Sequence, residues 1–139
     1  LIAHEHTSPY RHVVFQFHIR APLFVLRQWN KHQVGCAWNE ASGRYIQFDP
    51  KFGQLEWRAQ SPSIKQGSLD HIDPAVAEQA QEIYAQAVKF SYDSYLKLTE
   101  LGVCKEQART LLPQSLITEC YWTCSLHALL HFLHQRLDS

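Results

Sequence analysis

Residues 12–20, HVVFQFHIR, place a hydrophobic side chain at every second position. Such alternation predicts a β-strand with one buried face and one polar face. The buried face carries Val13, Phe15, Phe17 and Ile19. A strand of this kind is expected to be half-buried.

The longest predicted helix covers residues 75–101. It begins at Asp73–Pro74, because an acidic cap followed by proline is a typical helix start, and it ends at Gly102. Hydrophobic residues at helical spacing form its predicted buried stripe: Val76, Ala80, Ile83, Ala87, Phe90, Tyr95 and Leu98. A helix of this length beside a half-buried strand indicates an α+β fold.

Shorter elements complete this prediction. A helix is expected to begin at Ala21–Pro22, with the proline in its first turn. Further helices are predicted at residues 105–112, before Pro113, and at 125–138. Residues 46–68 are predicted to be a loop, and 115–124 fit either a strand or a helix. We therefore expect one α+β domain over residues 1–139.

The bulk composition narrows the possible partners. The chain has 139 residues, a formal net charge of zero and a pI of about 7.3. A neutral chain argues against a nucleic-acid backbone or an anionic membrane as the main partner, although a local cationic pocket remains possible. No membrane span or signal peptide is predicted. Because the chain starts at Leu1 and has no Met, we expect it to be cropped at both ends.

The four cysteines show no CxxC spacing, so reduced thiols in a cytoplasmic protein are the simpler interpretation. Cys120 and Cys124 fit buried thiols better than a metal pair. Cys36 follows His32 closely, but this spacing alone is a weak indication of a thiolate nucleophile.

Histidines and arginines supply further candidates. His127 and His131 lie four residues apart, as zinc ligands do, but they also fit an exposed helix face or a cofactor wall. No metal site is predicted. Arg44, Arg109 and Arg136 are candidate anion binders, since a guanidinium can hold a phosphate through two parallel hydrogen bonds.

Residues 27–45, RQWNKHQVGCAWNEASGRY, resemble the signature of the flavin-dependent thymidylate synthases. That signature is Arg-His-Arg, seven or eight residues, then Ser-x-Arg. Here it reads Lys31-His32-Gln33, eight residues, then Ser42-Gly43-Arg44. Four further blocks extend the resemblance over essentially the whole chain: HTSPYRHVVFQFHIRAPLFV, EWR with KQGS, QARTLLP, and TECYWTCSLHALLHFLHQRLDS.

The resemblance implies a mainly antiparallel sheet flanked by helices, in a homotetramer that binds FAD at subunit interfaces. It implies the methyltransferase reaction of dTMP biosynthesis, in which dUMP becomes dTMP. Methylenetetrahydrofolate would supply the carbon and NADPH would reduce the flavin. The Pro-Cys pair expected of the folate-only synthase does not occur in the sequence.

Site residues follow from the resemblance, position by position. The family holds dUMP at the positions of Gln28, Glu40, Ser42, Gly43, Arg44, Arg109 and Arg136. The positions near FAD and folate are His6, Ser8, Lys31, His32, Gln33, Asn39, Glu40, Ser125, His127 and His131. Arg44 and Arg109 are expected to grip phosphate or polarise the uracil, with Arg109 in the latter role. Ser42 is expected to bind substrate rather than act as a nucleophile.

This chain departs from the family pattern at several positions. Lys31 and Gln33 replace two signature arginines, His127 and His131 stand where Asn and Arg are usual, and Arg11 replaces an acid. With fewer fixed charges for the FAD pyrophosphate, weaker flavin retention is expected. Three alternatives stay open: a flavin enzyme that modifies another pyrimidine nucleotide, for example by hydroxymethylation, a non-catalytic nucleotide-binding relative, and a histidine-metal hydrolase.

Overall fold

The computed structural model describes residues 4, 6–42, 51–63 and 67–137. The chain divides into two compact units, Leu1–Ser42 with Gln114–Ser139, and Gly43–Pro113. Each unit is described by itself below, as the sheet unit and the helical unit. Within the described ranges, no helix has both the length and the hydrophobicity that crossing a membrane requires.

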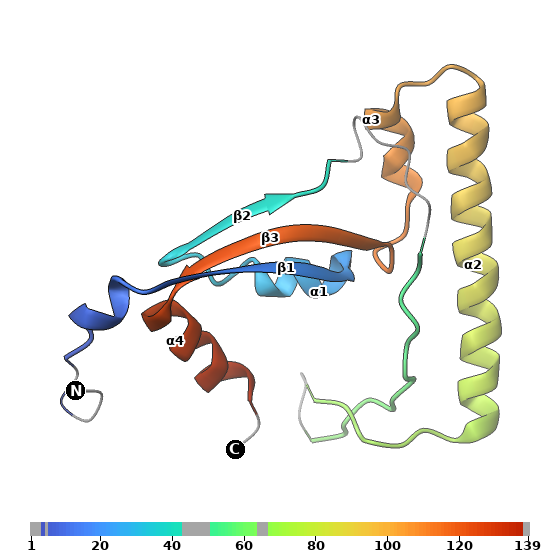
Figure 1. Ribbon diagram of the computed structural model, residues 1–139. Helices are drawn as coiled ribbons and strands as arrows, with labels where there is room; N and C mark the ends of the chain where they lie inside the picture. Colours follow the sequence, from blue (N-terminus) through green and yellow to red (C-terminus); the bar gives the residue numbers. More distant parts are fainter. Residues whose placement is uncertain (1–3, 5, 43–50, 64–66, 138–139) are drawn as a thin grey trace. The chain divides into compact units, whose positions relative to one another are not determined.

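The sheet unit is built on three antiparallel strands in the order β1-β3-β2 (Figure 1). They are β1(Val14–Pro22), β2(Cys36–Glu40) and β3(Ile117–Ser125). The predicted strand at residues 12–20 is therefore confirmed two residues further along, but its predicted buried face is largely exposed in the described residues: Val13 is 43%, Phe15 37% and Phe17 38% exposed. The ambiguous segment 115–124 is a strand, because its β-branched and aromatic residues pair with a neighbour on each side. The predicted α+β class with an antiparallel sheet is confirmed.

Strand β2 was not predicted from the sequence. It is only five residues long, and Asn39 and Glu40 have low strand propensity. Its register with β3 places Trp38 opposite Trp122 and Cys36 opposite Cys124. Cross-strand pairing with the hydrophobic strand β3 therefore stabilises β2, although its residues Asn39 and Glu40 have low strand propensity.

Two helices follow directly from strands. Helix α1(Leu23–Trp29) begins after Pro22, the last residue of β1, so the proline precedes the helix instead of lying in its first turn. Helix α4(Leu126–Arg136) begins after β3 and is capped by Ser125, whose hydroxyl accepts a hydrogen bond from the Ala128 amide at 3.2 Å.

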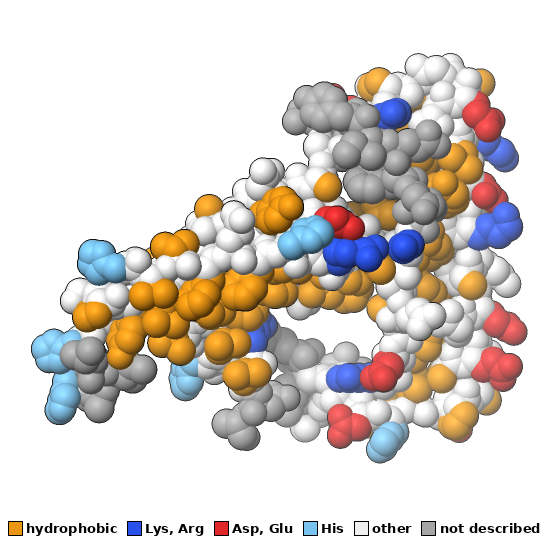
Figure 2. Space-filling model, viewed as in Figure 1, with side chains coloured by type: hydrophobic (Ala, Val, Ile, Leu, Met, Phe, Trp, Pro, Cys, Tyr) orange, Lys and Arg blue, Asp and Glu red, His pale blue; other side chains and the backbone are white. Residues whose placement is uncertain are grey.

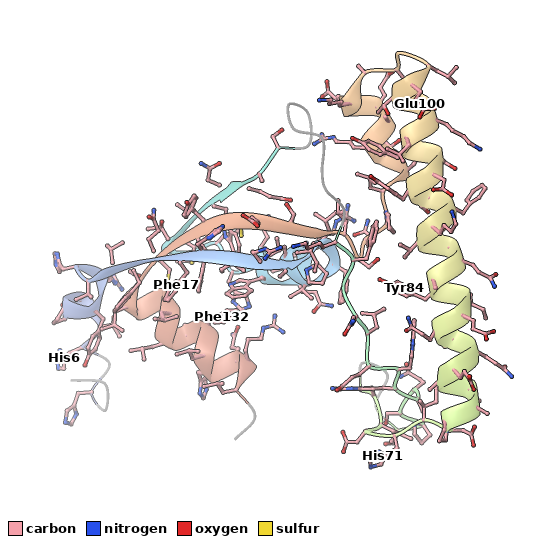
Figure 3. The ribbon with its side chains drawn as sticks, turned by 45° about the vertical axis from the view of Figure 1, so that its right-hand side comes forward. His6, Phe17, His71, Tyr84, Glu100 and Phe132 are labelled. Atoms are coloured by element: carbon pink, nitrogen blue, oxygen red, sulfur yellow. The ribbon has the colours of Figure 1, made fainter. Side chains whose placement is uncertain are left out.

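An aromatic cluster joins the sheet to both helices. At its centre lies Trp122 of β3, only 2% exposed. Four neighbouring rings have their centroids close to it: Phe17 at 5.7 Å, Trp29 at 5.1 Å, Trp38 at 5.7 Å and Phe132 at 5.3 Å. Phe17 and Phe132, labelled in Figure 3, come from β1 and α4. Figure 2 shows hydrophobic side chains gathered along β1 above α4. These contacts place α1 and α4 on the same face of the sheet.

The helical unit contains α2(Pro74–Glu100), α3(Lys105–Ala108) and the short 3-10 helix η3(Arg109–Leu111). Asp73 caps α2 as predicted, accepting a hydrogen bond from the Ala75 amide at 2.9 Å. Gly102 follows α2 with φ +84°, a backbone conformation that glycine adopts without a steric penalty.

The predicted buried stripe of α2 is largely wrong. Tyr95 is fully buried, but Val76, Ile83 and Phe90 are 48%, 68% and 76% exposed. The covered side is instead the one that presents tyrosine rings to residues 51–63. There the hydroxyl of Tyr84, labelled in Figure 3, donates to the Gly53 carbonyl at 2.8 Å. Amphipathic tyrosines lie on this face, and the predicted stripe shares with it Tyr95, whose ring stacks on that of Tyr92.

Candidate functional site

A tight connection between α1 and β2 presents Lys31, His32 and Gln33. The His32 amide donates to the Trp29 carbonyl at 3.0 Å, and the Cys36 amide donates to the Gln33 carbonyl at 3.1 Å. These bonds end the helix and begin the strand within a few residues. The family signature therefore lies on a backbone that is hydrogen-bonded at both ends.

Gly35 holds this connection against the start of α4. Its φ is +73°, and its carbonyl accepts a hydrogen bond from the Ser125 amide at 3.0 Å. A Cβ atom at this position would lie 3.0 Å from the Ser125 hydroxyl and 3.3 Å from the Ala128 Cβ. Glycine is thus required both for the backbone conformation and for the close approach to the helix cap.

Gly35→Ala is expected to lower the free energy of unfolding by about 2–4 kcal/mol, since left-handed strain and crowding of the Ser125 cap add together. Gly102→Ala is the matched control, because its φ is also positive but an added Cβ atom would have nothing within 4 Å. That variant should lose only about 1–2 kcal/mol. Denaturant unfolding followed by circular dichroism measures both, and equal losses would refute the close approach.

The connection and α4 enclose a pocket of about 350 Å³. Its lining joins two parts of the chain that are far apart in the sequence: Lys31, His32, Gln33, Val34 and Cys36 with Ala128, His131, Gln135 and Arg136. Lys31 and Arg136 bring positive charge, and among the described residues no carboxylate lines the pocket. The arrangement suits an anionic ligand that also accepts hydrogen bonds.

His32 and Arg136 are hydrogen-bonded inside this pocket. The guanidinium Nε and Nη2 atoms lie 3.3 and 3.1 Å from His32 Nε2. A guanidinium only donates, so His32 Nε2 accepts and carries no proton. Burial, then the charge of Arg136, and then His131 lower the pKa of His32. The Phe132 ring, 4.9 Å away and nearly perpendicular, is part of that burial.

Arg136→Leu is expected to raise the pKa of His32 by removing a neighbouring positive charge. The pKa should stay below the ordinary 6.5, because burial is the larger cause of the shift. An NMR titration of the imidazole measures this, with the resonance assigned through His32→Gln. Arg20→Leu is the control, because Arg20 pairs with Glu119 and not with His32. An unchanged His32 pKa in Arg136→Leu would contradict the hydrogen-bonded pair.

The lowered pKa of His32 makes the stability of the protein depend on pH. With a folded-state pKa below 6.5, unfolded His32 binds a proton before folded His32 does. The free energy of unfolding therefore falls as the pH drops from about 6.5 through the folded pKa, and it does not change through this group at higher pH.

Two neighbouring signature residues face opposite sides of the sheet. Glu40 lines a pocket of about 200 Å³ on the side of α1, together with Arg27 and Asn30. Asn39 lines a shallow pocket of about 250 Å³ on the other side, beside Tyr121. Adjacent strand residues alternate between faces, but both Asn39 and Glu40 also line a third pocket of about 300 Å³, together with His18, Glu119 and Tyr121.

The other predicted positions are spread more widely. Gln28 is exposed on α1, His6 is exposed near the N-terminus, and Ser8 begins η2(Ser8–Arg11). Ser125 caps α4, with His127 half-buried in its first turn. Ser42 is half-buried after β2, whereas Gly43 and Arg44 lie outside the described residues. Arg109 is exposed in the helical unit, at the start of η3.

The cysteines of the sheet unit are packed thiols. Cys120 and Cys124 are buried and unpaired, which agrees with the predicted core role. Burial raises the pKa of the Cys36 thiol, which disfavours the thiolate that a nucleophile needs. Among the described residues, no three His, Cys, Asp or Glu side chains are grouped to hold a metal ion.

Gln135 is a polar pocket residue that sequence reasoning missed, as it missed Val34 and Ala128. It lies four residues after His131 on α4, so both side chains fall on the same face of the helix. Arg27 and Asn30 were missed beside Glu40 because they come from α1 and its C-cap, whereas Glu40 lies on β2. Helical spacing from His131 is the signal that could have identified Gln135.

Comparison with known proteins identifies the family of the chain. A family model described as thymidylate synthase complementing protein matches residues 1–139. A relative from Thermosipho melanesiensis, named flavin-dependent thymidylate synthase, is 40% identical over 140 residues. The chain belongs to the flavin-dependent thymidylate synthase family. A second relative of that name, from Thermus thermophilus, is 42% identical over 138 residues.

The relatives of this flavin-dependent family are longer than the chain. The match covers 100% of the chain but 61% of the Thermosipho protein, and 99% of the chain but 50% of the Thermus protein. A solved structure of similar fold is a UMP/dUMP methylase, PolB from Streptomyces cacaoi, bound with 5-Br UMP. It aligns with a TM-score of 0.87 and 28% identity over 96% of this chain and 60% of its own. The family resemblance found in the signature is confirmed.

Proposed function

We propose that the full-length protein is a flavin-dependent thymidylate synthase, which converts dUMP to dTMP by reductive methylation. The observation that carries this proposal is the pocket where Lys31, His32 and Gln33 meet His131 and Arg136. Relatives that carry the enzyme's name at about 40% identity give it independent support. PolB, described as a UMP/dUMP methylase, is named for the same class of nucleotide.

The pocket suits part of an FAD molecule. Lys31 and the amide of Gln33 would meet the pyrophosphate, and His32 and His131 would lie against the rest of the cofactor. A dinucleotide extends beyond a pocket of about 350 Å³. We therefore infer that Asn39, Ser125 and His127 contact other parts of it, with His6 and Ser8 near flavin and folate. Bound flavin, reduced by NADPH, supplies the hydride, and methylenetetrahydrofolate supplies the carbon.

The nucleotide would be held mainly by arginines. Arg44 and Arg136 would bind phosphate, while Gln28, Glu40, Ser42 and Gly43 would position the sugar and base. Arg109 would lie beside a uracil carbonyl and stabilise negative charge as C5 attacks the one-carbon unit. Arg136 also hydrogen-bonds to His32, so it would connect the proposed nucleotide contacts with the proposed flavin contacts.

We further propose that residues 1–139 act as one domain and that the cytoplasmic enzyme is a homotetramer. An open pocket that holds only part of a dinucleotide is consistent with a site completed by a neighbouring subunit. The oligomer is measured directly by light scattering of the full-length protein.

An FAD titration tests the flavin part of the proposal. The full-length protein should quench FAD fluorescence on binding, and His32→Ala should weaken binding. Lys31→Arg/Gln33→Arg should bind FAD roughly tenfold more tightly, because two charge-assisted hydrogen bonds to pyrophosphate become available. Gln54→Arg, at an exposed position in the helical unit, is the control for added charge. FAD that stays on the wild-type protein through extensive dialysis would contradict the expected weak retention.

A further inference from the structure

Cys36 and Cys124 lie directly opposite each other on β2 and β3. Two hydrogen bonds define the type of this pair. The Ser125 amide donates to the Gly35 carbonyl, and the Ala41 amide donates to the Glu119 carbonyl. In the register of these strands, Gly35 lies opposite Ser125 and Ala41 lies opposite Glu119, so both are hydrogen-bonded pairs. Such pairs alternate with non-hydrogen-bonded pairs along antiparallel strands. Cys36 and Cys124, one residue along from Gly35 and Ser125, therefore form a non-hydrogen-bonded pair.

In such a pair the Cα atoms are about 4.5 Å apart and the side chains are at their closest. That separation falls within the range of roughly 4.4–6.8 Å that a disulfide bridges without backbone movement. Both side chains lie on the same face of the sheet, and both thiols are free. We propose that Cys36 and Cys124 are a redox pair that peroxide oxidation joins by a reversible cross-strand disulfide, which weakens flavin binding in the adjacent pocket.

Their different exposure assigns a role to each thiol. Cys36 lines the pocket of Lys31 and Arg136, whereas Cys124 is only 1% exposed. The Cys36 thiolate attacks one peroxide oxygen, the O–O bond breaks, and a sulfenic acid and one water form. The Cys124 thiolate then attacks the Cys36 sulfur and releases a second water. Two thiols lose two electrons and two protons, and hydrogen peroxide is reduced to two waters.

Cys120 cannot replace Cys124 in this pair. Cys120 is four residues before Cys124 on β3, where its partner is Glu40, and Cys104 is exposed in the helical unit. Burial raises the pKa of both Cys36 and Cys124, so the protein should be oxidised slowly near neutral pH and faster at mildly alkaline pH.

The proposed disulfide would also change the pocket of Lys31 and Arg136. The Cys36 thiol donates a weak hydrogen bond to the Val34 carbonyl at 3.7 Å, and oxidation removes that donor. Val34 lies beside Gly35 in the connection that presents Lys31 and Gln33. Resting on the proposed function, we expect the oxidised protein to bind FAD at least fivefold more weakly than the reduced protein.

Peptide mapping tests the bond itself. The full-length protein is treated with hydrogen peroxide at mildly alkaline pH, its free thiols are blocked, and it is digested with trypsin and chymotrypsin. Chymotrypsin cleaves after Tyr121 and Trp122, so Cys120 and Cys124 fall in different peptides. The expected product is a Cys36 peptide linked to a Cys124 peptide, which dithiothreitol separates. A link to Cys120 instead, or oxidised Cys36 without a link, would overturn the proposal.

Variants test the two roles. Cys124→Ala should leave Cys36 as a sulfenic acid that dimedone traps, and Cys36→Ala should prevent oxidation of Cys124. Cys104→Ala is the matched control and should form the link as the wild type does.

FAD titrations of reduced, oxidised and re-reduced protein then test the effect on the pocket. The fivefold loss should disappear after dithiothreitol and should not occur in Cys36→Ala. A linked protein with unchanged FAD affinity would refute the effect on flavin binding. If no form of the protein binds FAD, the proposed function fails, whereas the peptide map still decides whether the bond forms.

Discussion

Trp122→Ala is expected to lower the free energy of unfolding by about 3–5 kcal/mol, the loss typical of a large aromatic residue removed from a core. Trp122 is 2% exposed and its ring neighbours come from β1, β2, α1 and α4. The cavity would therefore open where all four of these elements meet. A domain with ordinary stability would lose a large part of it.

The adjacent residue is the natural control for this prediction. Tyr121 is 51% exposed on the opposite face of β3, where its ring contacts His18. Tyr121→Ala should lose about 1 kcal/mol or less, since surface substitutions are usually mild. Urea unfolding followed by far-UV circular dichroism, which does not depend on tryptophan fluorescence, compares the two. Similar losses at both positions would contradict a core centred on Trp122.

Arg109→Ala should reduce kcat of the full-length enzyme by about 10²–10³-fold, the usual cost of removing one group that stabilises charge in a transition state. Arg109 is exposed at the start of η3, so its removal should leave the stability of the protein nearly unchanged. Loss of activity without loss of stability separates a role in the reaction from a role in folding. The measurement is steady-state turnover of dUMP together with a thermal unfolding curve.

Lys89→Ala serves as the control for removal of a cation from the same unit. Lys89 forms an exposed pair with Asp93 at 2.7 Å, and no substrate role is proposed for it. Its turnover should match the wild type within about twofold, since Lys89 is not proposed to contact substrate, and its stability should change little because the pair is exposed. Arg109→Lys should recover part of the activity. If Arg109→Ala and Lys89→Ala have the same turnover, Arg109 has no catalytic role.

The elements that the sequence predicts well have one dominant signal. Strict alternation identifies β1, and Asp73–Pro74 with Gly102 marks both ends of α2. Strand β2 escapes prediction because its stability comes from pairing with β3 and not from its own residues. Most of the buried side of α2 was misassigned because tyrosines face residues 51–63, while Val76, Ile83 and Phe90 of the predicted stripe face solvent.

The contacts within the site depend on tertiary packing and could not be predicted from the sequence. Spacing along the chain cannot show that His32 and Arg136 touch, because they are 104 residues apart. The family signature places each residue near a ligand, but it assigns His32 to flavin and Arg136 to nucleotide separately. Their hydrogen bond emerges only when α4 packs on the sheet through Phe132 and Trp122. The opposite directions of Asn39 and Glu40 likewise depend on β2 being a strand.

Tritium release from dUMP labelled at uracil C5 tests the central claim most directly. The full-length protein is incubated with FAD, NADPH, methylenetetrahydrofolate and the labelled nucleotide, and the product is identified. The proposed function predicts tritium in water and an equal amount of dTMP, with both lost in Arg109→Ala. No release, with FAD bound and dUMP saturating, would contradict a thymidylate synthase, and release with a different nucleotide product would contradict methylation as the reaction.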